Sequence, residues 1–383
     1  MYTRLLNLPT DSKSVFLFGP RATGKSSWLK LNFPQCLTFN LLHSEIYNRL
    51  LANPAEIESL IPKNYTEWVI IDEIQRVPEL LNEVHRLIED KKQKFILTGS
   101  NARKLRREGV NLLAGRAITH YCYPLTTQEL KEDFKLNHAL KYGTLPMAVT
   151  EQNPQAYLES YISTYLREEV QQEGLTRNLA AFSRFLQAAS FSQASLLNVS
   201  DVARDCHVDR KQVESYFEIL EDLLIGIRLP AFTKMAKRRL LTSNKFFYFD
   251  AGVYRTIRPK GPLDSPEFID GAALETLFLQ EARAINSYLN LNLEIFHWRA
   301  QDGHEVDFVL YGEQGVFAFE IKRNKKFRLA DLSGLKLFLK DYPMAKAYFL
   351  YGGTQSQYLG QIEIHPFETV LKNLPQFLKG NAL

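Results

Sequence analysis

Two glycines that bracket four residues and are followed by Lys-Ser form the first chemically informative pattern in this 383-residue chain. The run comprises Gly19, Pro20, Arg21, Ala22, Thr23, Gly24, Lys25, Ser26 and Ser27. In such a P-loop the glycines let backbone N–H groups turn toward a phosphate, and the lysine reaches the β- and γ-phosphates as a point charge. The hydroxyl after the lysine ligates Mg²⁺. The run therefore predicts a site for ATP and Mg²⁺, with Ser26 as a metal ligand.

An acidic pair ends a second informative stretch, the apolar run Trp68–Ile71, which is typical of a central parallel strand. In this Walker B pattern Asp72 would hold the Mg²⁺ shell, and Glu73 would orient or deprotonate the attacking water. A third apolar run, beginning at Phe95, leads into Thr-Gly-Ser-Asn. We expect Ser100 or Asn101 there to act as a sensor of the γ-phosphate.

A single arginine, Arg116, stands just before the apolar-aromatic run from Ile118 to Tyr123. An arginine at that point could act as an arginine finger or a sensor of the nucleotide. A solvated arginine without a catalytic role is the alternative interpretation.

A further set of charged residues lies near the C-terminus. Glu275 falls in a predicted helix over 271–289, whereas Asp307, Glu320 and Lys322 fall in two predicted adjacent strands. Two carboxylates for a divalent metal and a lysine beside the attacking water are what a PD-(D/E)xK nuclease requires. The order of predicted elements, α-β-β-β-α-β, fits that core. The set thus predicts a nuclease-like site with a second divalent metal, or the same fold kept only for packing.

The elements that position these groups suggest three domains, as expected for a chain that is long for one core. We assign 1–150 to a P-loop ATPase domain with a parallel α/β sheet, 151–255 to a helical and winged-helix domain, and 256–383 to an α/β restriction-endonuclease-like domain. In the middle domain the helix-turn-helix spacing places Arg204, Arg210 and Lys211 where a recognition helix would begin. These cations would contact DNA, or the module would only pack against its neighbours.

Composition narrows the class of protein. The net charge of +4 does not by itself imply a nucleic acid or a membrane, and no apolar stretch approaches the roughly 18 residues of a membrane span. Cys36, Cys122 and Cys206 are far apart, which disfavours a disulfide framework or a zinc site. We expect a cytoplasmic protein without a membrane segment.

Together, four segments of the chain resemble the prokaryotic AAA+ family that carries a DUF4143 C-terminal region. They are the P-loop, the string Ile71–Pro78, the strand end Leu97–Ser100, and Leu113–Arg116 followed by Tyr123–Leu125. The resemblance implies an ASCE-type parallel sheet with the sensor strand between the two Walker strands. It also implies ATP hydrolysis with Mg²⁺.

Three hypotheses for function remain open at this point. The first is an AAA+-type ATPase whose nucleotide state is coupled to the winged-helix and nuclease-like tail, acting on or near DNA. The second is an ATP-dependent switch that gates binding to an unidentified protein partner, with a non-catalytic tail. The third is a metal-dependent nuclease regulated by ATP. An oligomer is compatible with each.

Overall fold

The computed structural model describes residues 2–8, 13–100, 113–166, 178–259, 261 and 265–380. Packing divides the chain into two compact units. Unit 1 comprises Thr3–Tyr123 with the short stretch Asp222–Leu224, and unit 2 comprises Tyr2, Pro124–Glu221 and the chain from Ile225 onward.

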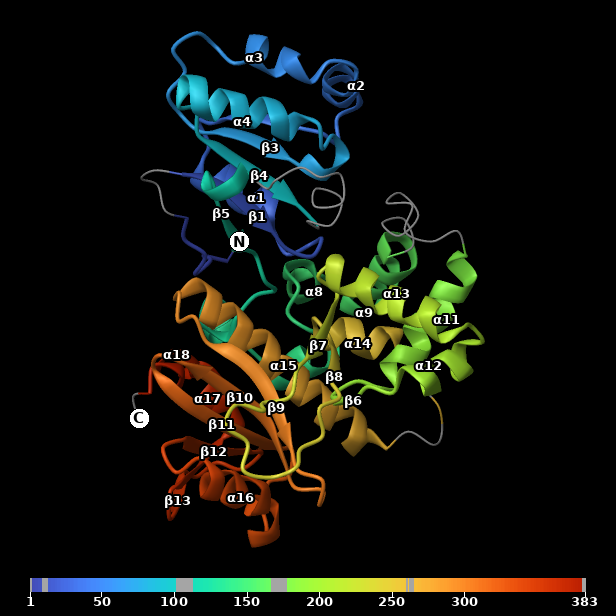
Figure 1. The fold of residues 1–383 in the computed structure, drawn as a ribbon, viewed down its shortest axis with the longest axis vertical. Coiled ribbons are helices and arrows are strands. Elements are labelled where there is room, and N and C mark those ends of the chain that lie inside the picture. Colours follow the sequence, from blue (N-terminus) through green and yellow to red (C-terminus); the bar gives the residue numbers. More distant parts are fainter. Residues whose placement is uncertain are drawn as a thin grey trace. The chain divides into compact units, whose positions relative to one another are not determined.

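Unit 1 contains a five-stranded parallel sheet in the order β2-β3-β4-β1-β5 (Figure 1, blue to green). The strands are β1 (Ser14–Phe18), β2 (Leu37–Asn40), β3 (Val69–Asp72), β4 (Phe95–Gly99) and β5 (Ala117–Tyr121). Strand β4 pairs with both β1 and β3, so the expected sensor strand does lie between the two Walker strands. The P-loop type of α/β sheet predicted for this part of the chain is confirmed.

The strands and helices of unit 1 follow from its apolar pattern. Every residue of β1, β3 and β4 is buried, as in parallel strands covered on both faces. The helices are α1 (Lys25–Asn32), α2 (Ser44–Ala52), α3 (Ile57–Leu60) and α4 (Leu80–Lys91). On α4 the buried residues Leu80, Leu81, Val84 and Leu87 recur at helical spacing, which confirms the predicted apolar face.

Unit 2 begins with four short helices and continues into the middle of the chain. They are α6 (Thr127–Leu130), α7 (Leu136–Tyr142), α8 (Pro146–Thr150) and α9 (Pro154–Ser160), followed by a π-helical turn over Tyr161–Leu166. The turn Gly143–Pro146, which we expected to end the first domain near residue 150, is fixed inside unit 2. The Thr144 amide donates to Asp250 Oδ2 at 2.9 Å, and a Cβ built on Gly143 would lie 1.9 Å from Asp250 Oδ1. Because this turn is packed, the chain divides earlier, at Tyr123 and Pro124.

The middle of the chain combines three helices with a three-stranded antiparallel sheet in the order β6-β8-β7. The helices are α11 (Leu179–Ser190), α12 (Val199–Cys206) and α13 (Arg210–Asp222), and the strands are β6 (Ser195–Leu196), β7 (Gly226–Leu229) and β8 (Lys245–Tyr248). The Phe217 ring of α13 lies 4.8 Å from Phe185 of α11 and 5.0 Å from Phe246 of β8. The expected helix-turn-helix order and the two following strands are therefore present.

The connection between β7 and β8 packs against the C-terminal sheet. Phe232 is buried in the same cluster as Trp298, and its ring centroid lies 5.2 Å from that of Tyr342. Arg238, from the basic run 234–239 between these two strands, forms an ion pair with Asp341. Burial of the Phe232 ring explains why this segment lies along the neighbouring sheet.

The C-terminal part of unit 2 is a mixed six-stranded sheet in the order β13-β14-β12-β11-β10-β9. Its elements are α14 (Ala251–Ile257), α15 (Pro266–Tyr288), β9 (Glu294–Arg299), β10 (Glu305–Gly312), β11 (Gly315–Lys322), α16 (Ser333–Asp341), β12 (Lys346–Tyr351), β13 (Gln357–Leu359), β14 (Ile362–Pro366), α17 (Phe367–Lys372) and α18 (Leu374–Leu378). The predicted α-β-β-β-α-β order is found from α15 to β12. Phe278 of α15 packs on Phe308 and Phe319, whereas Phe338 of α16 packs on Trp298, so the two helices cover the sheet from different sides (Figure 1).

Among the described residues, no helix has both the length and the apolar character needed to cross a membrane.

Candidate functional site

The P-loop of unit 1 is folded as a cradle with its lysine drawn inward. Lys25 is buried, and its Nζ donates to the backbone oxygens of Gly19 at 2.7 Å and Pro20 at 3.1 Å. Gly24 has φ 92°, a left-handed conformation that favours glycine, and it precedes the first turn of α1. A Cβ at Gly19 would meet the Cys122 oxygen at 2.3 Å, so only glycine fits beside the end of β5. The two glycines are thus required by the local backbone.

The end of β3 lies next to this loop. Ser26 Oγ donates to Asp72 Oδ2 at 2.9 Å, and the Thr98 hydroxyl of β4 bonds to Asp72 Oδ1. The two residues predicted to ligate Mg²⁺, Ser26 and Asp72, are therefore brought together although they are 46 positions apart. A hydroxyl and a carboxylate with neutral neighbours are hard oxygen donors of the kind Mg²⁺ takes, so these residues fit the ion.

Glu73, the predicted catalytic base, is held by the side-chain amide of Gln75. Its backbone is left-handed at φ 65°, and its side chain is nearly buried. Gln75 Nε2 donates to Glu73 Oε2 at 2.5 Å and to Ser100 Oγ at 3.0 Å. The structure therefore joins Glu73 and Ser100, the predicted sensor, through one side chain. Asn101, the other sensor candidate, lies outside the described residues.

The remaining residues of the predicted cradle have mixed exposure. Thr23 is buried and its hydroxyl donates to the Pro20 oxygen at 2.8 Å, whereas Arg21 and Ala22 are half-buried and Ser27 is exposed. Ala22 has φ 65°, so the loop contains a left-handed residue other than glycine. The Thr23 bond stiffens the loop just before Gly24.

Arg116 is not brought to the P-loop of its own unit. Its neighbour Ala117 pairs with Ser14 at the first residue of β1, whereas the P-loop follows the last residue of β1. With a rise of about 3.3 Å per residue, the Arg116 backbone lies on the order of 20 Å from Gly19 along the sheet. The Arg116 guanidinium forms an ion pair with Glu89 of α4. A role as a sensor for its own nucleotide therefore finds no support in this geometry.

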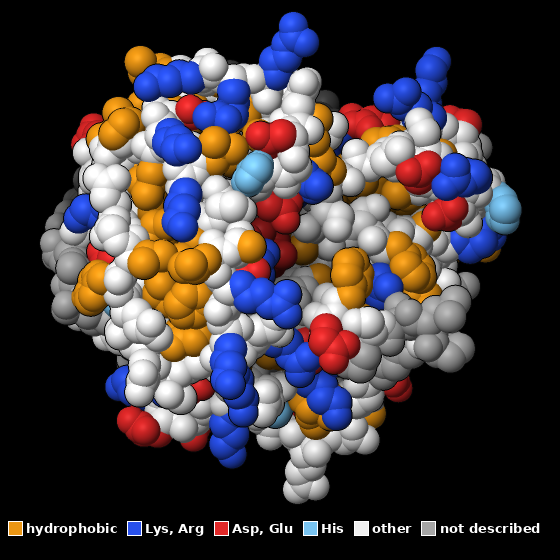
Figure 2. Space-filling model, turned by 90° about the horizontal axis from the view of Figure 1, so that it is seen from below, with side chains coloured by type: hydrophobic (Ala, Val, Ile, Leu, Met, Phe, Trp, Pro, Cys, Tyr) orange, Lys and Arg blue, Asp and Glu red, His pale blue; other side chains and the backbone are white. Residues whose placement is uncertain are grey.

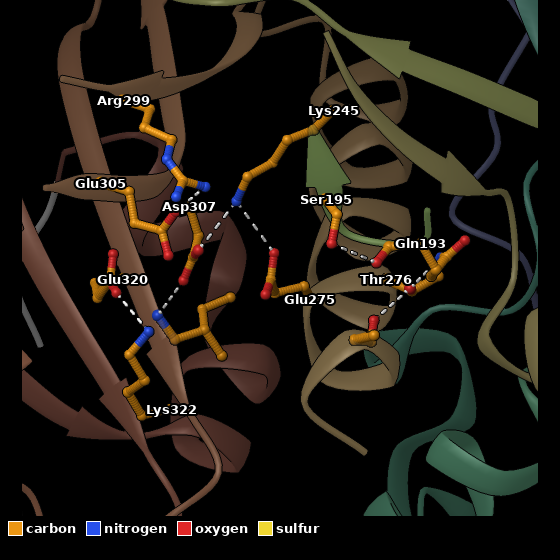
Figure 3. Close-up of polar contacts among 12 residues, drawn as sticks. Gln193, Ser195, Lys245, Glu275, Thr276, Arg299, Glu305, Asp307, Glu320 and Lys322 are labelled. Atoms are coloured by element: carbon orange, nitrogen blue, oxygen red, sulfur yellow. Dashed lines mark hydrogen bonds and ion pairs between the residues drawn. The ribbon is translucent and has the colours of Figure 1, made fainter. Parts of the chain in front are cut away.

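The charged residues predicted for the tail do lie together, but a further lysine lies among them (Figure 3). Lys245 Nζ, from β8, is 3.2 Å from Asp307 Oδ1 and 3.5 Å from Glu275 Oε2. Lys322 Nζ lies 2.7 Å from Glu320 Oε1, and the Ile321 amide donates to Asp307 Oδ2 at 2.9 Å. The pairing of β10 with β9 shifts register between Val306 and Val309, a stretch that includes Asp307. Such irregularities re-aim side chains.

The electrostatics of this cluster reflect burial and its two ammonium groups. Burial alone would lower the pKa of Lys245, but Glu275 and Asp307 raise it above its ordinary value. Burial would raise the pKa of Asp307, yet Lys245 and Lys322 hold it below the usual range. Burial and the neighbouring Asp307 raise the pKa of Glu275 to about 8 and that of Glu320 well above normal. If either Glu275 or Glu320 holds a proton, the charges of these two glutamates, Asp307 and the two lysines sum to zero.

A second divalent metal does not fit this cluster as it stands. Nothing among the described residues forms a group of three or more His, Cys, Asp or Glu side chains able to hold a metal ion. The gap between Glu275 and Asp307 contains the Lys245 ammonium. The expected second metal thus has no support here, because a like charge already lies between the two acids.

The cations predicted at the start of the recognition helix are exposed, but they differ in their surroundings. Arg204, on α12, forms ion pairs with Asp201 at 3.1 Å and Asp205 at 3.6 Å. Arg210 and Lys211 are exposed in the first turn of α13. On the face drawn in Figure 2, Lys and Arg side chains are scattered among acidic and hydrophobic ones.

Sequence reasoning missed three residues of these clusters. Thr98 and Gln75 hold the Walker carboxylates, and their only signal was proximity to the acids, on the next strand or two positions along the chain. Lys245 carried a clearer signal, because it is a lysine at the start of the aromatic run Phe246–Phe249.

Family models match the chain in three consecutive parts. An AAA domain matches residues 11–131, a domain of unknown function (DUF8612) matches 133–264, and a domain of unknown function (DUF4143) matches 270–370.

Two relatives are uncharacterized proteins of Mycobacterium tuberculosis and Mycobacterium bovis. Each is 26% identical over 352 residues, which cover 88% of this chain and 76% of the relative. Among solved structures, the Aeropyrum pernix ORC1 protein in complex with DNA is 12% identical, with a TM-score of 0.27, over 66% of this chain and 87% of that one. The AAA match falls on the P-loop sheet and the DUF4143 match on the C-terminal sheet, as the sequence resemblance implied. The chain thus matches an AAA domain followed, after DUF8612, by a C-terminal DUF4143 domain, the two parts of the family that its sequence resembles.

Proposed function

We propose that unit 1 binds ATP with Mg²⁺ and hydrolyses it. The observation that supports this best is the meeting of Ser26 and Asp72 at the mouth of the P-loop, with Glu73 directly after Asp72. The AAA-domain match over the same residues supports it as well. When bound, ATP supplies the γ-phosphoryl group, and Mg²⁺ neutralises charge on the phosphate oxygens.

Each residue of the cradle has a separate role in this proposal. Lys25 exchanges its bonds to the Gly19 and Pro20 carbonyls for bonds to phosphate oxygens, which are the stronger, charged acceptors. Ser26 and Asp72 hold the metal. Glu73 orients the attacking water and accepts its proton.

Gln75 acts as a positioning residue for Glu73. Its amide bonds fix one carboxylate oxygen of Glu73 and link it to Ser100 at the end of β4. A movement of Ser100 would therefore move the catalytic base, Glu73, through the Gln75 side chain. The Gln75 Oε1 atom is buried and accepts no hydrogen bond from the described residues.

Nucleotide binding and turnover of the full chain test the proposal. Lys25→Ala should abolish or greatly weaken ATP binding in a filter or fluorescence assay, because the cradle loses its charge partner. Lys30→Ala is the matched control, since Lys30 is an exposed lysine on the same helix. Wild-type chain that neither binds ATP nor releases phosphate in the presence of Mg²⁺ would contradict the proposal.

A second candidate function, contact with DNA, is favoured by the exposed Arg210 and Lys211 in the first turn of α13. In it, α11–α13 and β6–β8 act as a winged helix that approaches phosphates through these two cations. The rival is an ATP-gated interaction with a protein partner, in which unit 2 does not contact DNA.

Salt-dependent binding to duplex DNA separates these two candidates. The double variant Arg210→Ala/Lys211→Ala should weaken binding and reduce the slope of log K against log salt by about 2. Lys336→Ala/Lys340→Ala on α16 removes the same charge from another exposed helix and should not change the slope. Binding that is equal in all three chains would favour the protein partner. ATP turnover measured with and without DNA shows whether the two functions are coupled.

A further inference from the structure

A lysine from outside the C-terminal sheet lies beside the acidic side chains of the tail. Glu275 lies on α15, Asp307 on β10 and Glu320 on β11, whereas Lys245 is the first residue of β8 in the small antiparallel sheet (Figure 3). Only about 2% of the Lys245 surface and 1% of the Asp307 surface is exposed. The ammonium and the carboxylates are therefore shielded from bulk solvent, in a place where a charge left without its partner is costly.

The position of Lys245 is fixed by its backbone. β8 is the central strand of its sheet, and Lys245 is paired with Leu196 of β6 on one side and with Leu229 of β7 on the other. The next residue, Phe246, is fully buried and packs on Phe217 of α13. The pairing of the strands therefore fixes the backbone from which the Lys245 side chain reaches the acids.

The Lys245 ammonium lies where a cation would bridge the carboxylates of Glu275 and Asp307. Its Nζ lies within 3.5 Å of oxygens from both Glu275 and Asp307. A Mg²⁺ or Mn²⁺ ion needs carboxylate oxygens at about 2.1 Å and usually keeps several waters. Such an ion between these two acids would lie against the ammonium, whose like charge repels it.

We propose that Lys245 replaces the divalent metal of a nuclease-like acid cluster. Glu275, Asp307 and Glu320 then neutralise the buried Lys245 and the half-buried Lys322 instead of holding a catalytic ion. The cluster fastens the small sheet, and with it α11–α13, to the C-terminal sheet of unit 2. The tail thus keeps a nuclease-like order of elements, and its buried charges hold the small sheet to the C-terminal sheet within unit 2.

Manganese binding tests this inference in the full chain. The Asp72→Asn substitution first removes the P-loop metal ligand, so that Mn²⁺ followed by electron paramagnetic resonance reports on the rest of the chain. With Lys245 present, we expect no tight Mn²⁺ site. Asp72→Asn/Lys245→Ala should gain one Mn²⁺ per chain, about 10²-fold tighter or more, because a buried like charge has been removed. Adding Asp307→Asn should abolish the gained site.

Two matched variants keep the test specific. Lys245→Arg retains a cation between the acids and should gain no Mn²⁺ site. Arg238→Ala removes another cation of unit 2 that pairs with a buried acid, Asp341, and should gain none either, because a lone carboxylate does not hold the ion.

One outcome overturns the inference even if Lys245→Ala does not fold. The Asp72→Asn chain, which keeps Lys245, should show the same thermal unfolding temperature with and without Mn²⁺. A rise in that temperature on adding Mn²⁺ that Asp307→Asn removes would mean that the cluster takes a metal beside Lys245. Failure of unit 1 to bind ATP would not bear on this result.

Discussion

The two acid clusters of this protein contain similar residue types, yet their neighbours give them opposite character. At the end of β3, Asp72 is hydrogen-bonded by the neutral hydroxyls of Ser26 and Thr98. In the tail, Asp307 lies against the ammonium of Lys245. Asp72 is thus held by neutral groups, whereas Asp307 is paired with a buried cation.

This difference teaches that a carboxylate becomes a metal ligand or a structural ion according to its partners. In the P-loop the lysine of the motif, Lys25, is bonded to backbone carbonyls and can exchange them for phosphate. In the tail the lysines are bonded to the acids themselves. The same pattern of Asp, Glu and Lys therefore supports a ligand site in one unit and a buried charge network in the other.

The largest expected effect is on ATP turnover, through Glu73 of the first cluster. Glu73→Gln should reduce turnover by about 10²- to 10⁴-fold, because the attacking water loses its base, while ATP binding is kept. Phosphate release at saturating ATP measures it. Glu79→Gln, an exposed glutamate nearby, serves as the control. Wild-type turnover in Glu73→Gln would remove that residue from the mechanism.

Neutralising one aspartate in each cluster compares them directly by stability. Asp307→Asn leaves Lys245 buried beside fewer countercharges and should lower the thermal unfolding temperature by roughly 10 °C. Asp72→Asn leaves no cation unpaired and should change that temperature by only about 2 °C. Calorimetry of both variants gives the values. Equal shifts would mean that the tail acids do not compensate buried charge.

A smaller effect on ATP turnover should follow from replacing Gln75, the neutral residue that bonds to Glu73. Gln75→Met preserves the size of the side chain but removes its bonds to Glu73 and Ser100, so turnover should fall by about 10- to 100-fold. The dissociation constant for ATP should stay within about twofold, because the P-loop is untouched. Steady-state kinetics and ATP titration separate the two quantities. Gln93→Met, at another buried glutamine of unit 1, should alter neither; a parallel loss of affinity in Gln75→Met would indicate a general packing defect.

The smallest effect is expected at Arg116. Its ion pair with Glu89 is exposed, and pairs of that kind are screened by water and contribute little. Arg116→Ala should therefore change turnover by less than about twofold when the protein is dilute. Turnover that rises more steeply than linearly with wild-type concentration, and that Arg116→Ala abolishes, would instead place Arg116 at the nucleotide of another copy.

The residues of the first cluster could be proposed from the sequence because their geometry is local. The P-loop needs two glycines at fixed spacing, and the strand–loop–helix around it fixes where Lys25 and Ser26 stand. Asp72 could be added because parallel strands end at one edge of the sheet, which the register of β1, β4 and β3 bears out. The boundary near residue 150 was expected because a turn with Gly and Pro resembles a linker, whereas the bond from Thr144 to Asp250 shows that this turn is packed inside unit 2.

The sequence by itself determined the parallel P-loop sheet, the residues of its cradle and the order of elements in the tail, since each depends on short-range spacing and apolar pattern. Only the tertiary structure decided which charges meet. Lys245 and Asp307 are 62 positions apart and belong to different sheets, so no local pattern relates them. Because the character of a buried acid depends on its nearest countercharge, the metal predicted for the tail was replaced by a lysine that only the fold brings there.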